Sequence, residues 1–205
     1  MLDEVKGGFP VFVRSFGSGP QPALLLHCAL AHSKIWTPLA SRLSTALSMV
    51  APDMPGHGRS APWDRRSDLH DQVTAIAKDC LAEGAHVIGH SFGATVALRL
   101  AIEEPGKVHS LTLIEPVLFA AARERDPQVF DTYIDTSQSF GAALANDNWS
   151  DAAADFIRIW GDGRPWGSLS DTERTSFAAL FFRIGKMKIS LWLMEIFTLF
   201  GKKMI

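Results

Sequence analysis

Four short apolar runs are spread over the first half of the chain, and each ends in a polar loop. They occupy residues 23–27, 48–53, 85–90 and 111–115. Continuous apolar runs of this length are typical of strands that are buried on both faces of a mainly parallel sheet. An earlier alternating segment, Val11 to Arg14, is followed by the chain-breaking residues 16–20, which predicts an early hairpin strand with its turn.

Between these runs the spacing of apolar residues changes to that of a helix. One stripe recurs every three or four positions before Gly84 and consists of Val73, Ile76, Ala77, Cys80 and Leu81. A second stripe runs from Trp36 to Leu47, and a third helical segment covers residues 94–102. Strands that alternate with helices predict the α/β class, with a mainly parallel sheet flanked by helices.

Beyond Pro116 the strand pattern stops. Helical segments with aromatic residues continue to about residue 180, among them residues 151–160 and 171–181. We expect them to form a helical lid at the carboxyl ends of the strands, where open α/β sheets bind ligands. The expected organisation is an α/β core over residues 1–116, a helical lid over 117–180 and an atypical C-terminal tail over 181–205.

The composition narrows the setting and the partners. With 205 residues, 47% of them apolar, the chain is able to bury one main core. A net charge of -2 without a basic run gives no electrostatic basis for binding nucleic acid or an anionic membrane. The acidic start, Asp3 and Glu4, lacks the basic region of a secretory signal, and the apolar residues 189–200 fall short of the roughly 20 that span a bilayer. We therefore expect a cytoplasmic protein.

Residues 89–93, Gly-His-Ser-Phe-Gly, match the pattern G-x-S-x-G between a buried strand and an alanine-rich helix. Glycine on both sides permits a sharp strand-to-helix turn, so the hydroxyl of Ser91 is expected to project above the sheet. The same turn places the amide of Phe92 at a helix N-terminus, where it can donate to a developing oxyanion. In this setting we interpret the motif as a nucleophile site rather than a structural turn.

Two loops follow the first and second apolar runs at the same end of the predicted sheet. In residues 27–32 the Ala29 amide is the expected second oxyanion donor, and Cys28 and Leu30 beside it are expected to contact the substrate. On its own this segment would indicate only an ordinary connection with small residues. Residues 53–60 contain a proline and two glycines that favour a tight polar turn, and their expected role is structural.

Together these features resemble the α/β-hydrolase superfamily, in its esterase-like branch with a helical cap. The resemblance is carried by residues 24–27, 53–60, 89–93 and 113–116, and it covers roughly residues 10–180. It implies a nucleophile at Ser91, oxyanion amides at Ala29 and Phe92, and a substrate bound between this motif and the lid. Dehalogenation is disfavoured, because members with that activity carry a carboxylate where this chain has Ser91.

The chain departs from the family pattern in its histidines. Members place the acid and then the catalytic histidine after the nucleophile, whereas all seven histidines here lie at or before His109. Without a base a serine hydroxyl is a weak nucleophile, so acyl transfer is expected to be slow. His32 and His57 are minor alternatives for the base, and His90 is expected to point away from the pocket. Glu115 is the candidate acid, with a buried or capping carboxylate as the alternative.

The composition changes near residue 180. Alanine is frequent up to Ala179 and absent after it, while lysine, isoleucine and phenylalanine accumulate. This change predicts a truncated or frame-shifted end, with residues 186–205 foreign to the fold, including Trp192, Phe197 and Phe200. An incomplete sheet would leave an unpaired edge that favours association.

The sequence therefore favours a hydrolase of a carboxylic ester or related small-molecule acyl substrate, with no metal and no organic cofactor. Cys28 and Cys80 lie outside any metal-binding motif and are expected to be plain buried thiols. Hydrolysis of a thioester or lactone, and acyl transfer, stay open, as does the oligomeric state. The contrasting hypothesis is a catalytically impaired fragment or pseudo-enzyme that serves at most as a small-molecule binding module. Membrane attachment through the tail is disfavoured by its shortness and by Glu195.

Overall fold

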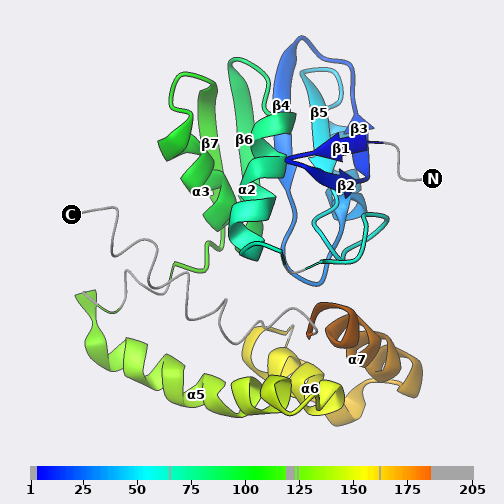
Figure 1. Cartoon of the computed structure of the whole chain (residues 1–205), viewed down its shortest axis with the longest axis vertical. Coiled ribbons are helices and arrows are strands. Elements are labelled where there is room, and N and C mark those ends of the chain that lie inside the picture. The colour runs from blue at the N-terminus through cyan, green and yellow to red at the C-terminus, as the bar shows by residue number, and fades with distance from the viewer. Residues whose placement is uncertain (1–3, 65, 119–122, 124, 162, 186–205) are drawn as a thin grey trace. The chain divides into compact units, whose positions relative to one another are not determined.

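The computed structural model describes residues 4–64, 66–118, 123, 125–161 and 163–185. The chain divides into two compact units, Met1–Val117 and Leu118–Ile205. Among the described residues, all strands lie in the first unit, and the second unit contains helices (Figure 1).

A five-stranded sheet forms the centre of the first unit. Its strands lie in the order β3-β5-β4-β6-β7. Their bounds are Val13–Phe16 for β3, Gln21–Leu26 for β4, Leu47–Pro52 for β5, Ala85–His90 for β6 and Val108–Ile114 for β7. The strands β4, β5, β6 and β7 pair in parallel, and β3 pairs antiparallel with β5. This arrangement confirms the fold class predicted from the alternating pattern.

The early hairpin differs from the prediction. The strand β3 pairs with β5, whereas the turn after β3 leads to β4 on the far side of β5. The hairpin is formed instead by β1 (Glu4–Lys6) and β2 (Phe9–Val11), which are joined by Gly7 and Gly8. These glycines have φ values of 55° and 74°, and a two-residue turn of type I′ requires positive φ at both positions. The prediction was wrong about the partner because alternation along a strand does not specify which strand it joins.

Helices cover both faces of the sheet (Figure 1). On one face Trp36 of η1 (Ser33–Trp36) and Ala40 of α1 (Thr37–Leu43) share a buried cluster with Leu25 of β4. Because side chains alternate along a strand, Leu24 and Leu26, both fully buried, point to the other face. That face is covered by α2 (Leu69–Cys80) and α3 (Phe92–Glu103), which pack against β4, β6 and β7. The site described below lies where β6 meets α3.

The second unit has an aromatic core. It contains α5 (Pro127–Ala145), α6 (Trp149–Trp160), η2 (Trp166–Ser168) and α7 (Asp171–Gly185). The rings of Phe140, Phe156, Trp160 and Phe181 lie with centroids between 5.0 and 6.1 Å apart. The helix α7 continues past residue 180, so Phe181 packs in this core rather than in a tail. The role of this unit as a lid stays a prediction, and residues 186–205, with Trp192, Phe197 and Phe200, lie outside the described residues.

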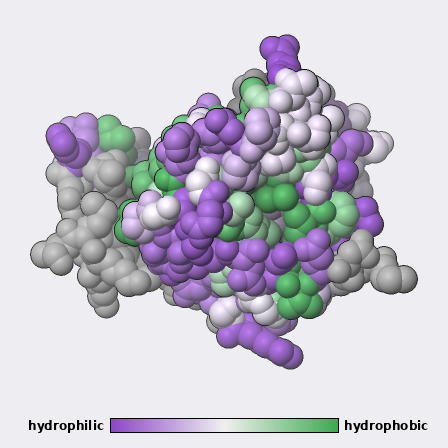
Figure 2. Space-filling view, turned by 90° about the horizontal axis from the view of Figure 1, so that it is seen from above, coloured by the Kyte–Doolittle hydropathy of each residue, from purple (hydrophilic) through white to green (hydrophobic). Residues whose placement is uncertain are grey.

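The surface is mixed in polarity. Hydrophilic residues cover much of the face shown in Figure 2, and hydrophobic residues gather in patches between them. Exposed large apolar side chains include Val5, Ile35 and Ile102, and scattered residues of this kind are normal in folded proteins. In the described part of the chain, no helix has the length and apolarity needed to cross a membrane.

Candidate active site

Ser91 occupies the turn between β6 and α3 in a backbone conformation that L-residues avoid. Its φ is 52° and its ψ is -115°. A non-glycine residue held in such a region costs about 1–3 kcal/mol and persists only where the surrounding structure enforces it. The amide of Ser91 donates to the carbonyl oxygen of Ile114 at 2.9 Å, which ties the turn to the end of β7. The side chain is half-buried, so the hydroxyl is not sealed in the core.

The glycines on both sides of the motif are required by close backbone contacts. A Cβ atom on Gly89 would lie 2.4 Å from the carbonyl oxygen of Gly93. A Cβ atom on Gly93 would lie 2.2 Å from the carbonyl oxygen of Leu26 and 2.5 Å from that of His27. Only hydrogen fits at these positions. The contacts of Gly93 also place the first turn of α3 directly against the end of β4.

Phe92 begins α3 directly after Ser91, and its side chain is buried. The carbonyl oxygen of Ser91 accepts the amides of Ala94 at 3.0 Å and Thr95 at 3.3 Å, which closes the first helical turn. The N–H of Phe92 is therefore among the first N–H groups of the helix, where partial positive charge gathers. This is the place that the sequence predicted for an oxyanion donor.

Ala29 lies just beyond β4, the strand next to β6 in the sheet. Its N–H has no hydrogen-bond partner among the described residues. The following residue, Leu30, has a positive φ of 65° and donates its N–H to Nε2 of His57 at 3.3 Å. Ala29 is half-buried, and the role of its N–H as the second oxyanion donor stays a prediction.

Two buried histidines join the loops that follow β4 and β5. Nε2 of His27 accepts the N–H of Met54 at 3.0 Å, and Nε2 of His57 accepts the N–H of Leu30. Each ring also donates its Nδ1–H to a carbonyl of its own loop, at 2.8 and 2.9 Å. Each histidine thus binds a backbone N–H of the opposite loop, and the ring centroids lie 5.4 Å apart. We call His27 and His57 the histidine latch.

Both histidines of the latch are neutral. Burial is the main cause that lowers the pKa of His27 to about 3, and the neighbouring His57 lowers it further. Burial likewise lowers the pKa of His57. A protonated ring would turn an acceptor nitrogen into a donor that faces a backbone N–H. With both nitrogens engaged, His57 is not available as a base for Ser91, which answers one alternative that the sequence left open.

Asp53 holds the turn after β5 from within. Its carboxylate is buried and accepts the N–H of Ser33 at 2.6 Å and the N–H of Arg59 at 2.9 Å. The hydroxyl of Ser60 donates to the carbonyl oxygen of Asp53 at 2.6 Å. Gly58 has a φ of 51°, and a Cβ atom at this position would lie 2.1 Å from Oδ2 of Asp53. Glycine therefore leaves room for the carboxylate. These contacts give residues 53–60 the structural role that was expected.

Glu115, the candidate acid, follows β7 with a φ of 47°. Its side chain is 85% exposed, and its carboxylate lies 3.5 Å from Nε2 of His90. This exposure excludes the alternative of a buried carboxylate. His90 therefore faces Glu115 at the end of β7.

The described residues place no base beside Ser91. The Ser91 hydroxyl has no hydrogen-bond partner among them. His32 is exposed and caps η1. His86 and His109 lie ring to ring at 4.9 Å on the strands β6 and β7. His70 is bonded to Thr95 at 3.2 Å.

The other residues expected to line the pocket are neutral. Cys28 and Leu30 are half-buried on the loop after β4. Burial raises the pKa of the Cys28 thiol, which keeps it protonated at neutral pH and makes it a poor nucleophile. Within the part of the chain that the structure describes, no group of three or more His, Cys, Asp or Glu side chains could hold a metal ion.

The latch was not predicted from the sequence, although one signal for it is present. His27 directly follows a buried strand, and a polar side chain at such a position needs a hydrogen-bond partner. The identity of that partner, in a loop that begins some 27 residues later, depends on the pairing of β4 with β5. The turn of Ser91 lies between β6 and α3 as the sequence predicted, and the role of the Ala29 amide stays a prediction.

A mainly parallel sheet with a strained, glycine-flanked serine between a central strand and its helix defines the α/β-hydrolase class. The sequence profile of the alpha/beta hydrolase family matches residues 23–192. The chain therefore belongs to this family, as the resemblance in its motifs indicated.

Individual relatives include enzymes named for ester cleavage. The chain is 36% identical to lipase LipV of Mycobacterium tuberculosis over 149 aligned residues. The aligned segment covers 68% of this chain and 56% of the lipase. It is 35% identical over 104 residues to a pimeloyl-[acyl-carrier protein] methyl ester esterase of Nitrosomonas europaea, 51% of this chain and 40% of the esterase. The chain thus spans about half the length of these curated relatives.

Solved structures share the fold. A loop variant of a haloalkane dehalogenase from Bradyrhizobium elkanii matches with a TM-score of 0.66 at 22% identity, covering 93% of this chain and 67% of that chain. An alpha/beta hydrolase from Sphaerobacter thermophilus matches with a TM-score of 0.62 at 21% identity. The match covers 94% of this chain and 73% of the hydrolase chain. At such identities the likeness concerns the fold alone.

Proposed function

We propose that this chain belongs to a serine hydrolase that cleaves a carboxylic ester or a related small-molecule acyl compound, with Ser91 as the nucleophile. The observation that carries the proposal is the strained backbone of Ser91, held by two glycines that tolerate no Cβ atom. Strain of this kind is maintained at functional sites. Two relatives, a lipase and a methyl ester esterase, support ester cleavage as the chemistry.

In the proposed reaction the Ser91 oxygen bonds to the acyl carbon while a base removes the hydroxyl proton. The carbonyl oxygen becomes an oxyanion, which the amides of Ala29 and Phe92 stabilise. The bond to the leaving alcohol then breaks as the alcohol takes a proton, and water releases the acid from the acyl-serine. Cys28 and Leu30 are proposed to contact the acyl group, and Glu115 to be the acidic partner of the base. A cytoplasmic location remains part of the proposal.

A second candidate is a binding module that holds an acyl compound without turning it over. The observation in its favour is that no histidine among the described residues contacts the Ser91 hydroxyl. A serine without a base loses most of the rate that a complete triad provides.

A fluorophosphonate probe separates the two candidates. Hydrolase function predicts covalent labelling of the full chain that disappears in Ser91→Ala and persists in Ser48→Ala, which alters an exposed serine on β5. Mass spectrometry locates the adduct. A folded wild-type protein, checked by circular dichroism, that stays unlabelled would contradict the hydrolase proposal and favour the binding module.

A further inference from the structure

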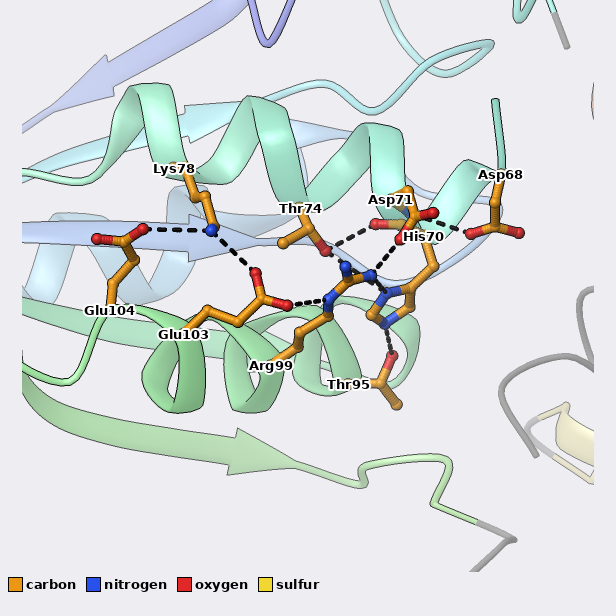
Figure 3. A network of polar contacts seen from close by, with 9 residues as sticks. All are labelled: Asp68, His70, Asp71, Thr74, Lys78, Thr95, Arg99, Glu103 and Glu104. Atoms are coloured by element: carbon orange, nitrogen blue, oxygen red, sulfur yellow. Dashed lines mark hydrogen bonds and ion pairs between the residues drawn. The ribbon is translucent and has the colours of Figure 1, made fainter. Parts of the chain in front are cut away.

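His70 is a buried histidine in the first turn of α2, and hydrogen bonds with Thr95 and Arg99 join it to α3 (Figure 3). Its side chain is only 3% exposed. Nε2 lies 3.2 Å from the hydroxyl oxygen of Thr95, and the ring meets that of Phe92 edge to face with centroids 5.5 Å apart. A buried imidazole between two helices is therefore directed at the helix that begins after Ser91.

The hydroxyl of Thr95 fixes the direction of this contact. It donates its hydrogen to the carbonyl oxygen of Phe92 at 2.7 Å. The hydroxyl oxygen therefore accepts the hydrogen bond from His70, and Nε2 of His70 carries the proton.

Thr95 also binds the peptide unit that contains the expected oxyanion donor. Its own N–H donates to the carbonyl oxygen of Ser91 at 3.3 Å. That carbonyl and the N–H of Phe92 belong to one planar peptide, so fixing the carbonyl fixes the direction of the N–H. Through its N–H and its hydroxyl, Thr95 holds the peptides on both sides of Phe92.

The other side of His70 is held by charged groups (Figure 3). Nδ1 faces Nη1 of Arg99 at 3.3 Å and accepts from it. The guanidinium is anchored by Asp71 at 2.5 Å and by Glu103 at 2.7 Å. Arg99 thus supplies a donor that requires Nδ1 to be unprotonated.

Burial, assisted by Arg99, keeps His70 neutral at physiological pH. Burial is the main cause that lowers its pKa to about 4, and Arg99 lowers it further, while Asp68, Asp71 and Glu103 raise it by less. The Nε2–H form that the hydrogen bonds require is therefore the form present at neutral pH.

We propose that His70 is a positioning residue of the Ser91 site: through the hydroxyl of Thr95 it fixes the first turn of α3, and with it the direction of the Phe92 N–H. The proposal rests on the proposed function, because the Phe92 N–H matters for rate only if an oxyanion forms. A purely structural role in packing α2 against α3 is the alternative, and it would affect stability without affecting the reactivity of Ser91.

Paired variants distinguish positioning from packing. Thr95→Val keeps the shape but removes the hydroxyl, whereas Thr95→Ser keeps the hydroxyl. His70→Leu removes the donor, whereas His70→Gln retains an N–H near the position of Nε2. Thr74→Val is the matched control, because this buried threonine on α2 donates its hydroxyl to the His70 carbonyl oxygen at 2.7 Å. Its oxygen also lies 3.5 Å from Nδ1, but that nitrogen is unprotonated and the hydroxyl hydrogen points to the carbonyl, so neither atom donates to the other.

The first measurement is the rate constant for labelling of Ser91 by the fluorophosphonate, corrected for the folded fraction. Thr95→Val and His70→Leu are expected to slow labelling by about tenfold, because a displaced donor stabilises the oxyanion less. Thr95→Ser, His70→Gln and Thr74→Val are expected to stay within about twofold of the wild type. Equal rates in Thr95→Val, His70→Leu and the wild type would overturn the proposal.

The second measurement does not depend on activity. In NMR spectra of the full chain, Thr95→Val and His70→Leu are expected to move the amide signal of Phe92, and Thr74→Val to leave it in place. The imidazole nitrogens of His70 are expected to report the Nε2–H form at pH 7. If the wild type is not labelled, the proposed function is contradicted, and the NMR measurement alone tests the positioning role. A Phe92 amide signal that does not move in Thr95→Val and His70→Leu would reject that role. A His70 ring that carries its proton on Nδ1 would also reject it.

Discussion

The strained turn of Ser91 depends on residues that have no side chain. Gly93 is the tighter of the two flanking glycines, because its missing Cβ atom leaves room for the carbonyl oxygens of Leu26 and His27. Those carbonyls belong to the end of β4, which precedes the loop that carries Ala29. We therefore expect a side chain at Gly93 to push the first turn of α3 away from the end of β4.

We predict that Gly93→Ala lowers the free energy of unfolding of the first unit by at least about 2 kcal/mol, because a methyl group would overlap backbone atoms that cannot rotate away. Gly106→Ala is the control in the same unit, since nothing lies within 4 Å of its Cβ position, and it should be neutral or slightly stabilising. Urea unfolding followed by circular dichroism measures both. Equal stabilities would show that the close approach at Gly93 is relaxed in solution.

The histidine latch predicts a residue-specific effect at Leu30. His57→Leu removes the acceptor of the Leu30 N–H, and His57→Asn retains only a group near Nδ1, so both are expected to speed hydrogen exchange of that amide. His57→Gln places an amide oxygen near the position of Nε2 and should preserve protection. Hydrogen exchange measured by NMR reports this directly, and uniform protection in all three variants would show that Nε2 does not hold the loop.

At the scale of elements, β7 is the exposed feature of the sheet. In the described part of the chain it pairs only with β6, and it exposes Ser110, Thr112 and Ile114. It carries no charged residue between Val108 and Ile114 apart from the titratable His109. An uncharged strand with a free edge offers its backbone to another strand.

We therefore predict that Thr112→Lys reduces self-association of the chain, because a charged side chain at the edge disfavours strand pairing. Thr132→Lys, an equivalent charge change on the exposed surface of α5, should have no such effect. Light scattering over a range of protein concentrations measures the difference. If both variants associate like the wild type, the edge of β7 is not the contact.

Elements were predicted well where burial alone sets the pattern. The runs that became β4, β5 and β6 are apolar because these strands are buried between layers on both faces of the sheet. In β7, by contrast, exposed residues alternate with half-buried ones over most of its length. The strand β1, which is the hairpin partner of β2, was missed, and the bounds of α5 were not predicted within the helical region of residues 117–180. The signal for the hairpin was the pair Gly7 and Gly8, whose positive φ values become meaningful only once two strands flank them.

At the scale of the whole molecule, buried neutral histidines link stability to pH. The pKa of His27 is lowered to about 3, that of His70 to about 4, and that of His57 is also lowered, against an ordinary value of 6.5. Above pH 6.5 these rings are neutral in both the folded and the unfolded chain, so their full contribution is present. As the pH falls below 6.5, these histidines become protonated in the unfolded chain but stay neutral in the folded chain. The free energy of unfolding therefore decreases.

We predict that the free energy of unfolding decreases between about pH 6.5 and pH 5 by up to about 1.4 kcal/mol per pH unit for each buried histidine. Denaturant unfolding at about pH 7.5 and pH 5 measures this, and His57→Gln should reduce the dependence because one titrating group is removed. The range from about pH 6.5 to pH 5 lies above the ordinary pKa of Asp and Glu side chains. A change in stability within this range is therefore attributed to the histidines. A stability that is the same at both pH values would contradict buried neutral rings.

The sequence by itself determined the α/β class and the position of the glycine-flanked serine, because these depend on local patterns of burial and on residues adjacent in the chain. Only the tertiary structure decided what the histidines do. His27 and His57 bind each other's loops, and His70 binds Thr95 across two helices. Hydrogen bonds between distant segments depend on which strands and helices are neighbours, and no local pattern in the chain encodes that adjacency.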